Sequence, residues 1–416
     1  MKKFIFLTII AFSTSFVNAQ WQQTNYSFGG YIFTNCMATN GTDVYVCNNS
    51  SGIYRTTDNG NTWSAVNNGL PTNPQVKALA INGTSIFAGV TDGVYLSTNN
   101  GNNWTHLTNG LPSVNFYPSV FAISGSNIFV GTGTSIGTAD GIHLSTNNGS
   151  SWYTVNNGLP TNDNITSLAI SGTNIYAGTE NNGIFLSTNN GSNWAAMNNG
   201  IGLAEIKSLV VKNSYVFATT YNTVSDGVYL STNNGSSWTA VNNGISYAQY
   251  CILYALAISG SNIFTAGFSA MTASNVAYFS NNDGNNWVNV SSGLPAYNSN
   301  TIQSLVINNL YIFAGTMDGT VWKCSLSQIT EIENINNNKE IDIFPNPAKN
   351  EITINNPNAT QNTLISIRNI QGRELIQENV NGTTNIINIS KLENGIYFLT
   401  LQNEKESYVR KIVIQK

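Results

Sequence analysis

The side chains best suited to chemistry are carboxylates and tyrosines in the loops between short apolar runs. The carboxylates are Asp92, Asp140, Asp163, Glu180, Glu205, Asp226 and Asp318, and the tyrosines are Tyr117, Tyr221, Tyr247, Tyr250 and Tyr297. Acidic and amide groups beside aromatic rings suit the hydroxyl groups of sugars, and paired carboxylates are the groups that hydrolyse glycosidic bonds. For any single residue the alternative is turn chemistry, because Asp-Gly pairs such as Asp92-Gly93 are common in turns.

Metal chemistry and nucleic-acid binding find no support in the composition. The two histidines, His106 and His143, fall in different repeat units and have no metal-ligand spacing. We expect both to be packed or solvated, and we predict no metal and no cofactor. Charged residues make up 9% of the chain, and the formal net charge is −4. Because no basic patch is visible, nucleic acid is not expected as a partner.

The loops that carry these residues belong to a repeat. Tryptophans recur every 41 to 49 residues, at Trp21, Trp63, Trp104, Trp152, Trp194, Trp238 and Trp287. The unit that starts at Trp152 contains four short runs, WYTV, ITSLAIS, IYAGT and GIFLST, separated by Asn-Gly-rich turns. Four strands at this period are typical of one blade of a β-propeller.

The number of repeats predicts an all-β, seven-bladed β-propeller over residues 20–328. Each kind of run occurs seven times, but no tryptophan strand follows the last one, Gly319–Ser325, and no blade precedes Trp21–Thr24. We therefore expect Trp21–Thr24 to complete the seventh blade and close the ring. Closure removes exposed sheet edges, which are a liability for aggregation.

Propeller geometry sorts the loops onto two faces. The NNGLP loops and the loops before the GIYLS runs share one face, which also carries the longest insertions, at 133–140, 221–226 and 269–275. Loops on a rigid scaffold commonly carry binding, so we expect a ligand there. The predicted ligand residues are Asp92, Asp140, Glu180, Asp226, Asp318, Tyr117, Tyr247, Tyr250 and Tyr297.

The turn before each later tryptophan reads LSTNNGSSW or a close variant, and it resembles the Asp box of the bacterial neuraminidase repeat. The acidic or amide position holds Asp58, Asn99, Asn147, Asn189, Asn233 and Asn282, and the turns end at Trp63, Trp104, Trp152, Trp194, Trp238 and Trp287. A hydroxyl and an Asp or Asn oxygen bond turn amides, glycine supplies a positive φ, and tryptophan packs between blades. We therefore interpret the motif as scaffold and assign it no catalytic role.

The resemblance raises two enzymatic possibilities. Sialidases of this family use three arginines to hold the substrate carboxylate, but Arg55 is the single arginine between residues 20 and 328. A sialidase is therefore rejected. Glycoside hydrolases of the xyloglucanase type place one carboxylate from each of two propellers across a cleft, whereas this sequence predicts one propeller. Our main hypothesis is a non-catalytic binding or adhesion module for glycan or protein, and a polysaccharide-active glycoside hydrolase is the alternative.

The N-terminus has the pattern of a secretory signal peptide. Lys2 and Lys3 precede the apolar run Phe4–Phe12, and Val17-Asn18-Ala19 resembles a small-residue cleavage site. We predict a signal peptide over residues 1–19, cleavage before Gln20, and no transmembrane segment elsewhere. Export permits disulfides, and Cys36 and Cys47 flank a predicted hairpin that places them opposite each other. Both a cross-strand disulfide and two small buried thiols remain open.

The composition changes near Gln328. Residues 329–339 are a predicted linker, and residues 340–416 read as a small antiparallel β-sandwich of short alternating strands. This segment resembles the type A C-terminal sorting domain of the type IX secretion system. The matching runs are Phe344-Pro345-Asn346-Pro347, Ile370-Gln371-Gly372-Arg373, Gly395-Ile396-Tyr397 and Lys411-Ile412-Val413-Ile414.

The sorting-domain resemblance carries several implications for the whole protein. It implies a bacterium of the Bacteroidetes type, the type IX machinery as a partner, and a location outside the cell or on its surface. Members of the family usually lose the domain during export and are released or attached to surface lipopolysaccharide. The extracellular ligand itself is not identified by the sequence.

Overall fold

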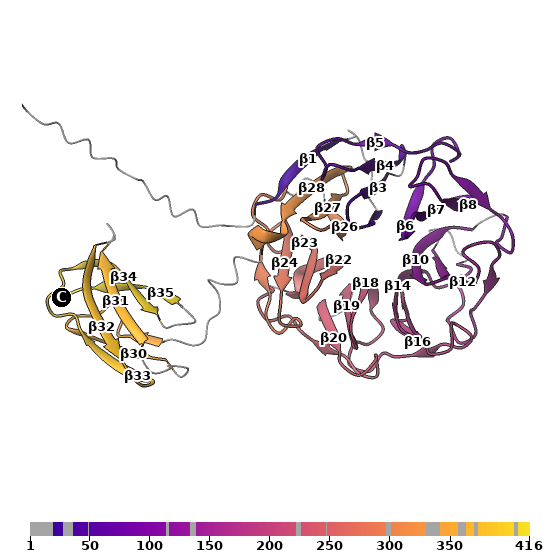
Figure 1. The fold of residues 1–416 in the computed structure, drawn as a ribbon. Coiled ribbons are helices and arrows are strands. Elements are labelled where there is room, and N and C mark those ends of the chain that lie inside the picture. The colour runs from indigo at the N-terminus through magenta and orange to yellow at the C-terminus, as the bar shows by residue number, and fades with distance from the viewer. Residues whose placement is uncertain are drawn as a thin grey trace, which may run out of the picture. The chain divides into compact units, whose positions relative to one another are not determined.

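The structure is a computed structural model. It describes residues 20–27, 36–48, 50–113, 116–133, 139–221, 226–246, 248–296, 301–329, 342–356, 363–369, 373–402 and 407–416, with the backbone alone for 27 and 407–409. The chain divides into two compact units, Met1–Ile329 and Thr330–Lys416. Both are built from strands, and the first unit is propeller-like, with its sheets arranged around a common centre (Figure 1).

The described part of the first unit contains seven four-stranded antiparallel sheets. The first three join β2 (Cys36–Thr39), β3 (Val44–Asn48), β4 (Gly52–Thr56) and β5 (Ser64–Ala65); β6 (Val76–Asn82), β7 (Ser85–Val90), β8 (Gly93–Ser97) and β9 (Thr105–Leu107); and β10 (Pro118–Ser124), β11 (Asn127–Thr132), β12 (Ile142–Ser145) and β13 (Tyr153–Thr154). The next two join β14 (Ile165–Ser171), β15 (Asn174–Thr179), β16 (Ile184–Ser187) and β17 (Ala195–Ala196); and β18 (Glu205–Lys212), β19 (Tyr215–Tyr221), β20 (Gly227–Ser231) and β21 (Thr239–Ala240).

The last two sheets differ in how they are assembled. One is preceded by the short 3-10 helix η1 (Ala248–Tyr250) and joins β22 (Cys251–Ser259), β23 (Asn262–Ser269), β24 (Ser274–Ser280) and β25 (Val288–Asn289). The other joins β26 (Ile302–Ile307), β27 (Tyr311–Thr316) and β28 (Thr320–Ser325) to β1 (Gln22–Ser27) from the other end of the unit. Gln22 lies opposite Lys323 in this pairing. The N-terminal strand therefore supplies the fourth strand of the last sheet, and it begins one residue later than Trp21.

The tryptophans link consecutive sheets. The indole Nε1 of Trp194 donates a hydrogen bond of 2.7 Å to the carbonyl oxygen of Val155, in the preceding sheet. Equivalent bonds run from Trp21, Trp104, Trp238 and Trp287. Trp152 instead donates to Gly149 in its own turn. These five indoles therefore satisfy their polar atom and bury their ring at the same junction, whereas the Trp63 Nε1 has no hydrogen-bond partner among the described residues.

The turns with the LSTNNG pattern are held by hydrogen bonds among their own residues. The Ser187 hydroxyl donates to Asn189 Oδ1 at 2.9 Å and accepts the backbone N–H of Gly191 at 2.8 Å. The Asn189 side chain accepts the backbone N–H of Asn193 at 2.9 Å. The same three bonds recur in the other five copies. Gly191 has φ of 82°, a region that glycine adopts without steric cost.

The first sheet contains the cysteine pair. Cys36 and Cys47 lie directly opposite each other on β2 and β3, with Cα atoms 5.4 Å apart, and form a disulfide. Of the two alternatives left open by the sequence, the structure has the bonded one. Cys251 and Cys324 are buried free thiols.

The second unit contains two sheets over one core. One joins β29 (Asp342–Phe344), β30 (Glu351–Asn355) and β33 (Thr384–Asn388), and the other joins β32 (Glu374–Val380), β31 (Thr363–Asn369), β34 (Gly395–Gln402) and β35 (Ser407–Ile414). Buried side chains from both sheets share one cluster, among them Ile352, Ile387, Ile365 and Leu399. Alternation of apolar and polar residues along each strand produces this arrangement.

Several residues of the predicted sorting motif hold this unit together. Asn346 accepts the backbone N–H of Val413 at 2.8 Å and donates to the Lys411 carbonyl at 3.2 Å. Pro345 and Pro347, on either side of it, follow cis peptide bonds. The Tyr397 side chain, two residues after Gly395, is buried, and its hydroxyl donates to the Glu393 carbonyl at 2.9 Å. The predicted run Ile370-Gln371-Gly372 lies outside the described residues.

Candidate ligand site at the centre of the sheet ring

The innermost strands of six sheets carry a β-bulge at the same position. The pairing of each strand with its neighbour skips one residue, so that two residues oppose one. A bulge of this kind bends the strand and re-aims the extra side chain. The six skipped residues are Lys77, Ser119, Thr166, Lys207, Tyr254 and Gln303.

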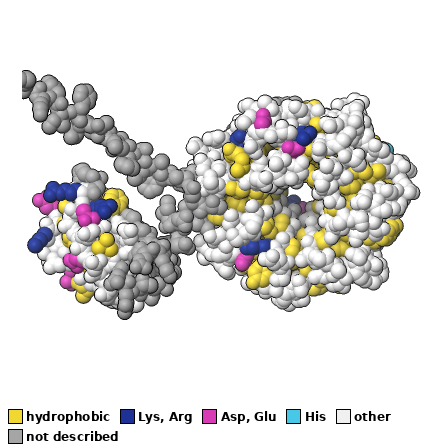
Figure 2. Space-filling view, in the orientation of Figure 1, with side chains coloured by type: hydrophobic (Ala, Val, Ile, Leu, Met, Phe, Trp, Pro, Cys, Tyr) yellow, Lys and Arg dark blue, Asp and Glu magenta, His cyan; other side chains and the backbone are white. Residues whose placement is uncertain are grey.

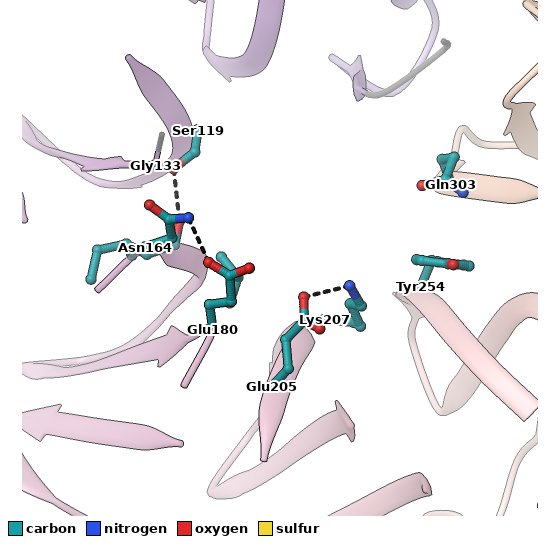
Figure 3. A pocket seen from close by; sticks show the side chains of 10 residues that line it. Ser119, Gly133, Asn164, Glu180, Glu205, Lys207, Tyr254 and Gln303 are labelled. Atoms are coloured by element: carbon teal, nitrogen blue, oxygen red, sulfur yellow. Dashed lines mark hydrogen bonds and ion pairs between the residues drawn. The ribbon is translucent and has the colours of Figure 1, made fainter. Parts of the chain in front are cut away.

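Five of these six side chains line one cavity of about 340 Å³. Figure 2 shows the centre of the sheet ring hollowed, and Figure 3 shows the lining side chains converging from several sheets. The lining residues are Ser119, Gly133, Asn164, Ile165, Thr166, Glu180, Glu205, Lys207, Tyr254 and Gln303. Lys77, the sixth bulge residue, does not line it. The same backbone feature, repeated in five sheets, therefore places five different polar side chains around one cavity.

Lys207 is held in place by an acidic partner and two aromatic rings. Its ammonium forms an ion pair with Glu205, two residues earlier on β18. The same nitrogen lies 5.2 Å from the ring centroid of Tyr221 and 5.4 Å from that of Tyr254. Attraction between a cation and the face of an aromatic ring adds to the ion pair at such distances. The positive charge of Lys207 is thus matched within the protein.

The second carboxylate of the cavity, Glu180, has a different environment. Its Oε2 accepts a hydrogen bond of 2.6 Å from Asn164 Nδ2 (Figure 3), and its side chain is exposed. Within the described part of the chain, no lysine, arginine or histidine lies within ion-pair distance of it. Glu180 therefore brings an unmatched negative charge to the cavity.

The hydroxyl groups of the cavity are used by the scaffold. The Ser119 hydroxyl lies 2.7 Å from the carbonyl oxygen of Ile165 and 3.1 Å from that of Gly131. The Thr166 hydroxyl donates to the carbonyl of Ile206. Since Ile165 and Ile206 belong to the next sheets, these bonds tie neighbouring sheets together around the cavity.

The residues predicted as ligands do not form one site. Glu180 lines the cavity. Tyr117 and Tyr250 lie just before β10 and β22, where their carbonyls accept the backbone N–H of Gly133 and Ala270, as Asn164 does for Glu180. Tyr117 therefore takes the place of Asn164 in its own sheet, whereas Tyr250 lies two residues farther from the bulge. Tyr247 and Tyr297 lie outside the described residues.

The other predicted carboxylates have local contacts. Asp92 accepts the Tyr95 hydroxyl at 3.0 Å, and Asp318 accepts the Thr316 and Thr320 hydroxyls. Asp226 is buried. Asp140 is partly buried, and burial raises its pKa. Asp318 therefore has the turn role that was the alternative to ligand binding. Glu205, which was not among the predicted ligand residues, lines the cavity.

One histidine is buried, and the other is exposed but stacked on a tyrosine. The His106 ring stacks on Tyr95 at 4.5 Å, and His143 is buried against Phe116 at 5.0 Å. Burial lowers the pKa of His143 to about 4. In the described ranges, no three His, Cys, Asp or Glu side chains are grouped so that they hold a metal ion.

Sequence reasoning missed the bulge residues although a signal was present. The six inner strands read QVKALAI, YPSVFAI, NITSLAI, EIKSLVV, ILYALAI and TIQSLVI. The apolar residues around the third position repeat, but the third position itself is Lys, Ser, Thr, Lys, Tyr or Gln. A position that varies inside a repeated frame is free of the packing that fixes its neighbours.

Comparison with protein families supports both units. Residues 342–415 match the family described as secretion system C-terminal sorting domain. The second unit is a sorting domain of the type IX secretion system. This confirms the assignment of the C-terminal segment and indicates export or display on the cell surface. Residues 8–138 match the DUF6242 beta propeller domain, which confirms a propeller domain. The likeness of the turns to the Asp box stays a prediction.

Solved structures agree on the fold of the first unit. YCF48 bound to D1 peptide has a TM-score of 0.55 at 12% identity, covering 74% of this chain and 95% of that one. The GH74 xyloglucanase from Xanthomonas campestris has a TM-score of 0.57 at 14% identity, covering 74% and 54%. The GH74 enzyme from Niastella koreensis has a TM-score of 0.56 at 15% identity, covering 95% and 75%.

At these identities the likeness extends to the fold alone. The curated proteins contain no match to this chain. No helix in the part of the chain that the structure describes is long and apolar enough to cross a membrane.

Proposed function

We propose that this protein is an exported propeller that binds an extracellular glycan or protein without catalysing a reaction, and that the cavity at the ring centre is its binding site. The observation that carries the proposal is the cavity, where side chains from five inner strands meet on a rigid frame. Preorganised polar groups in a concave site are typical of ligand binding. Glu180 is the predicted ligand residue that the proposal retains at the cavity.

The proposal includes a finer architecture. The seven four-stranded sheets form a closed seven-bladed propeller over residues 20–328, with β1 completing the last blade, as the β1–β28 pairing supports. The LSTNNG turns are Asp boxes with a scaffold role. Residues 1–19 are a signal peptide, 329–339 are a linker, and 340–416 fold as a β-sandwich that is lost during export, after which the protein is released or attached to surface lipopolysaccharide.

Export is tested by truncation in a host with a type IX system. Deletion of residues 340–416 is expected to leave the propeller in the periplasm, because the sorting domain is what the machinery recognises. The full-length chain processed in parallel is the control, and immunoblots of periplasm, cell surface and medium are the measurement. Delivery of the truncated protein to the surface at the normal level would refute the export route.

Binding is tested on a glycan array and by capture of extracellular proteins with the chain Gln20–Lys416. Replacing Tyr254 or Gln303 with alanine is expected to weaken binding by about tenfold or more, the usual effect of removing a central contact. Asp58→Asn is a matched control, since the other five turns carry asparagine at that position. A partner that binds all three variants equally would place the binding site elsewhere.

A glycoside hydrolase is the second candidate, because two carboxylates, Glu180 and Glu205, line one cavity. Glycosidases use such a pair, one as acid and one as base or nucleophile. The pairing of Glu205 with Lys207 favours binding instead. Release of reducing ends from xyloglucan and related polysaccharides, abolished by Glu180→Gln and by Glu205→Gln separately, would establish the enzyme.

A further inference from the structure

Most polar side chains of the cavity already bond other groups of the protein. Ser119 and Thr166 donate to backbone carbonyls, Asn164 donates to Glu180, and the Gln303 side-chain amide donates to Thr301. Lys207 is paired with Glu205. Among the charged side chains of the cavity, the Glu180 carboxylate is the one without a partner of opposite charge in the described residues. Such a site suits a ligand that brings donors.

The charge of the cavity points the same way. The Lys207–Glu205 pair is neutral as a unit, so Glu180 leaves the cavity with a net negative charge. Lys77, the other bulge lysine, does not line the cavity. The propeller segment as a whole contains ten acidic and five basic residues. A hollow with low-dielectric walls focuses this field and raises the local concentration of cations.

The wall of the cavity already holds one cation. The Lys207 ammonium is bound by a carboxylate and by the faces of Tyr221 and Tyr254. The contacts of Lys207 therefore show that a carboxylate and aromatic ring faces of the wall can bind an alkylammonium group. Glu180, on the neighbouring sheet, offers a second carboxylate in the same cavity (Figure 3).

Size limits what can enter. The cavity measures about 340 Å³. Ligand pockets run from roughly 300 to 1,000 Å³, so this one is at the small end of the range. One side chain or one sugar ring fills such a space, so the cavity takes a single group of a larger ligand. An unmatched carboxylate selects between the two single groups in favour of a charged side chain.

We propose that the cavity binds the guanidinium or ammonium group of an arginine or lysine side chain presented by an extracellular polypeptide, with Glu180 as the charged contact. This inference rests on the proposed binding function and specifies its ligand. Glu180 pairs with the cation. The engaged hydroxyls and the Lys207–Glu205 pair keep the wall rigid.

The test uses N-acetyl-arginine amide as the probe and N-acetyl-citrulline amide as its neutral isostere. Both are titrated by NMR into the chain Gln20–Lys416 at low salt. We expect the arginine probe to bind at least tenfold more tightly than the citrulline probe. Glu180→Gln should weaken arginine binding by at least tenfold, and Asp58→Asn, which removes a distant carboxylate, should leave it unchanged. Thermal melts of both variants check that they fold.

The outcomes separate this inference from the broader proposal. Equal binding of the two probes, no binding of the arginine probe, or unchanged binding in Glu180→Gln would overturn the cationic ligand. If the same preparation binds a neutral glycan and Tyr254→Ala removes that binding, the binding function stands and this inference fails. If captured ligands of every kind ignore Glu180, Tyr254 and Gln303, both fail.

Discussion

The buried histidine of β12 makes folding stability depend on pH in a way that one substitution should remove. His143 is 1% exposed and packs against the edge of Phe116, and both ring nitrogens lack a hydrogen-bond partner among the described residues. Burial lowers the pKa of His143 to about 4, and no charged neighbour contributes to the shift. The neutral imidazole is therefore the form that the folded protein accepts.

The sign and size of the effect follow from linkage. Since the folded pKa lies below the unfolded value of roughly 6.5, the unfolded chain binds the proton first as the pH falls. The loss of folding stability caused by His143 is absent above the unfolded pKa and grows as the pH falls from there toward about 4. Each unit of pKa shift is worth about 1.4 kcal/mol, so the full loss is about 3 kcal/mol, and about 2 kcal/mol is already lost at a pH near 5.

The assay is urea unfolding of the chain Gln20–Lys416 at neutral pH and near pH 5. His143→Phe is the informative variant, because the matching position in the next sheet is Phe185. The variant should be more stable than the parent protein near pH 5 by about 2 kcal/mol more than at neutral pH. His106→Gln, at an exposed position, controls for the replacement of a histidine. Parallel pH profiles of the parent and His143→Phe would refute this account of the burial.

Two more stability effects and one spectroscopic result are expected. Replacing Cys36 and Cys47 with serine should lower the free energy of unfolding by about 3 kcal/mol, as loop-closure entropy estimates for a short loop, and reductant should change the parent protein but not the variant. Ser187→Ala leaves the buried Gly191 amide without its acceptor and should cost about 1–3 kcal/mol in urea unfolding, against no change for Ser151→Ala at an outer turn position. Tyr254→Phe retains the ring beside Lys207, so the NMR resonances of the Lys207 side chain should stay shifted, whereas Tyr254→Ala should move them.

The repeating parts of the fold could be predicted from the sequence because packing repeats them. Most of the tryptophans, the Asn-Asn-Gly turns and the LAIS-type runs perform the same task from sheet to sheet, so the period of the chain predicts their positions. The bond from Trp194 to Val155 and the bonds within the Ser187 turn are local consequences of these repeated residues. The strand boundaries followed closely, with β1 beginning at Gln22 where Trp21 was expected.

The site was predicted less well, because loop carboxylates that look alike in the sequence have different surroundings in the structure. Asp318 lies in a turn where threonine hydroxyls donate hydrogen bonds to its carboxylate. Glu180 directly follows the last residue of β15 and lines the cavity. Glu205 was named among the loop carboxylates but was left out of the predicted ligand residues, and Lys207 became recognisable as a site residue only through the bulge on β18. A bulge is a property of strand register, and the residue type alone does not predict it.

Variation among the repeats separates scaffold from site in this chain. The glycine of the LSTNNG turn is retained in all six copies, because each turn needs its positive φ. The bulge residue lies on the inner strand of its sheet, where its contacts differ from sheet to sheet, and its type differs in nearly every sheet. In two sheets the bulge residue, Ser119 or Thr166, donates a hydrogen bond to the next sheet. In the others a lysine, a tyrosine or a glutamine occupies it, and these groups, with Glu180, set what the cavity can hold. A change of ligand in a related chain should therefore appear first at the bulge positions, with the turns and tryptophans unaltered.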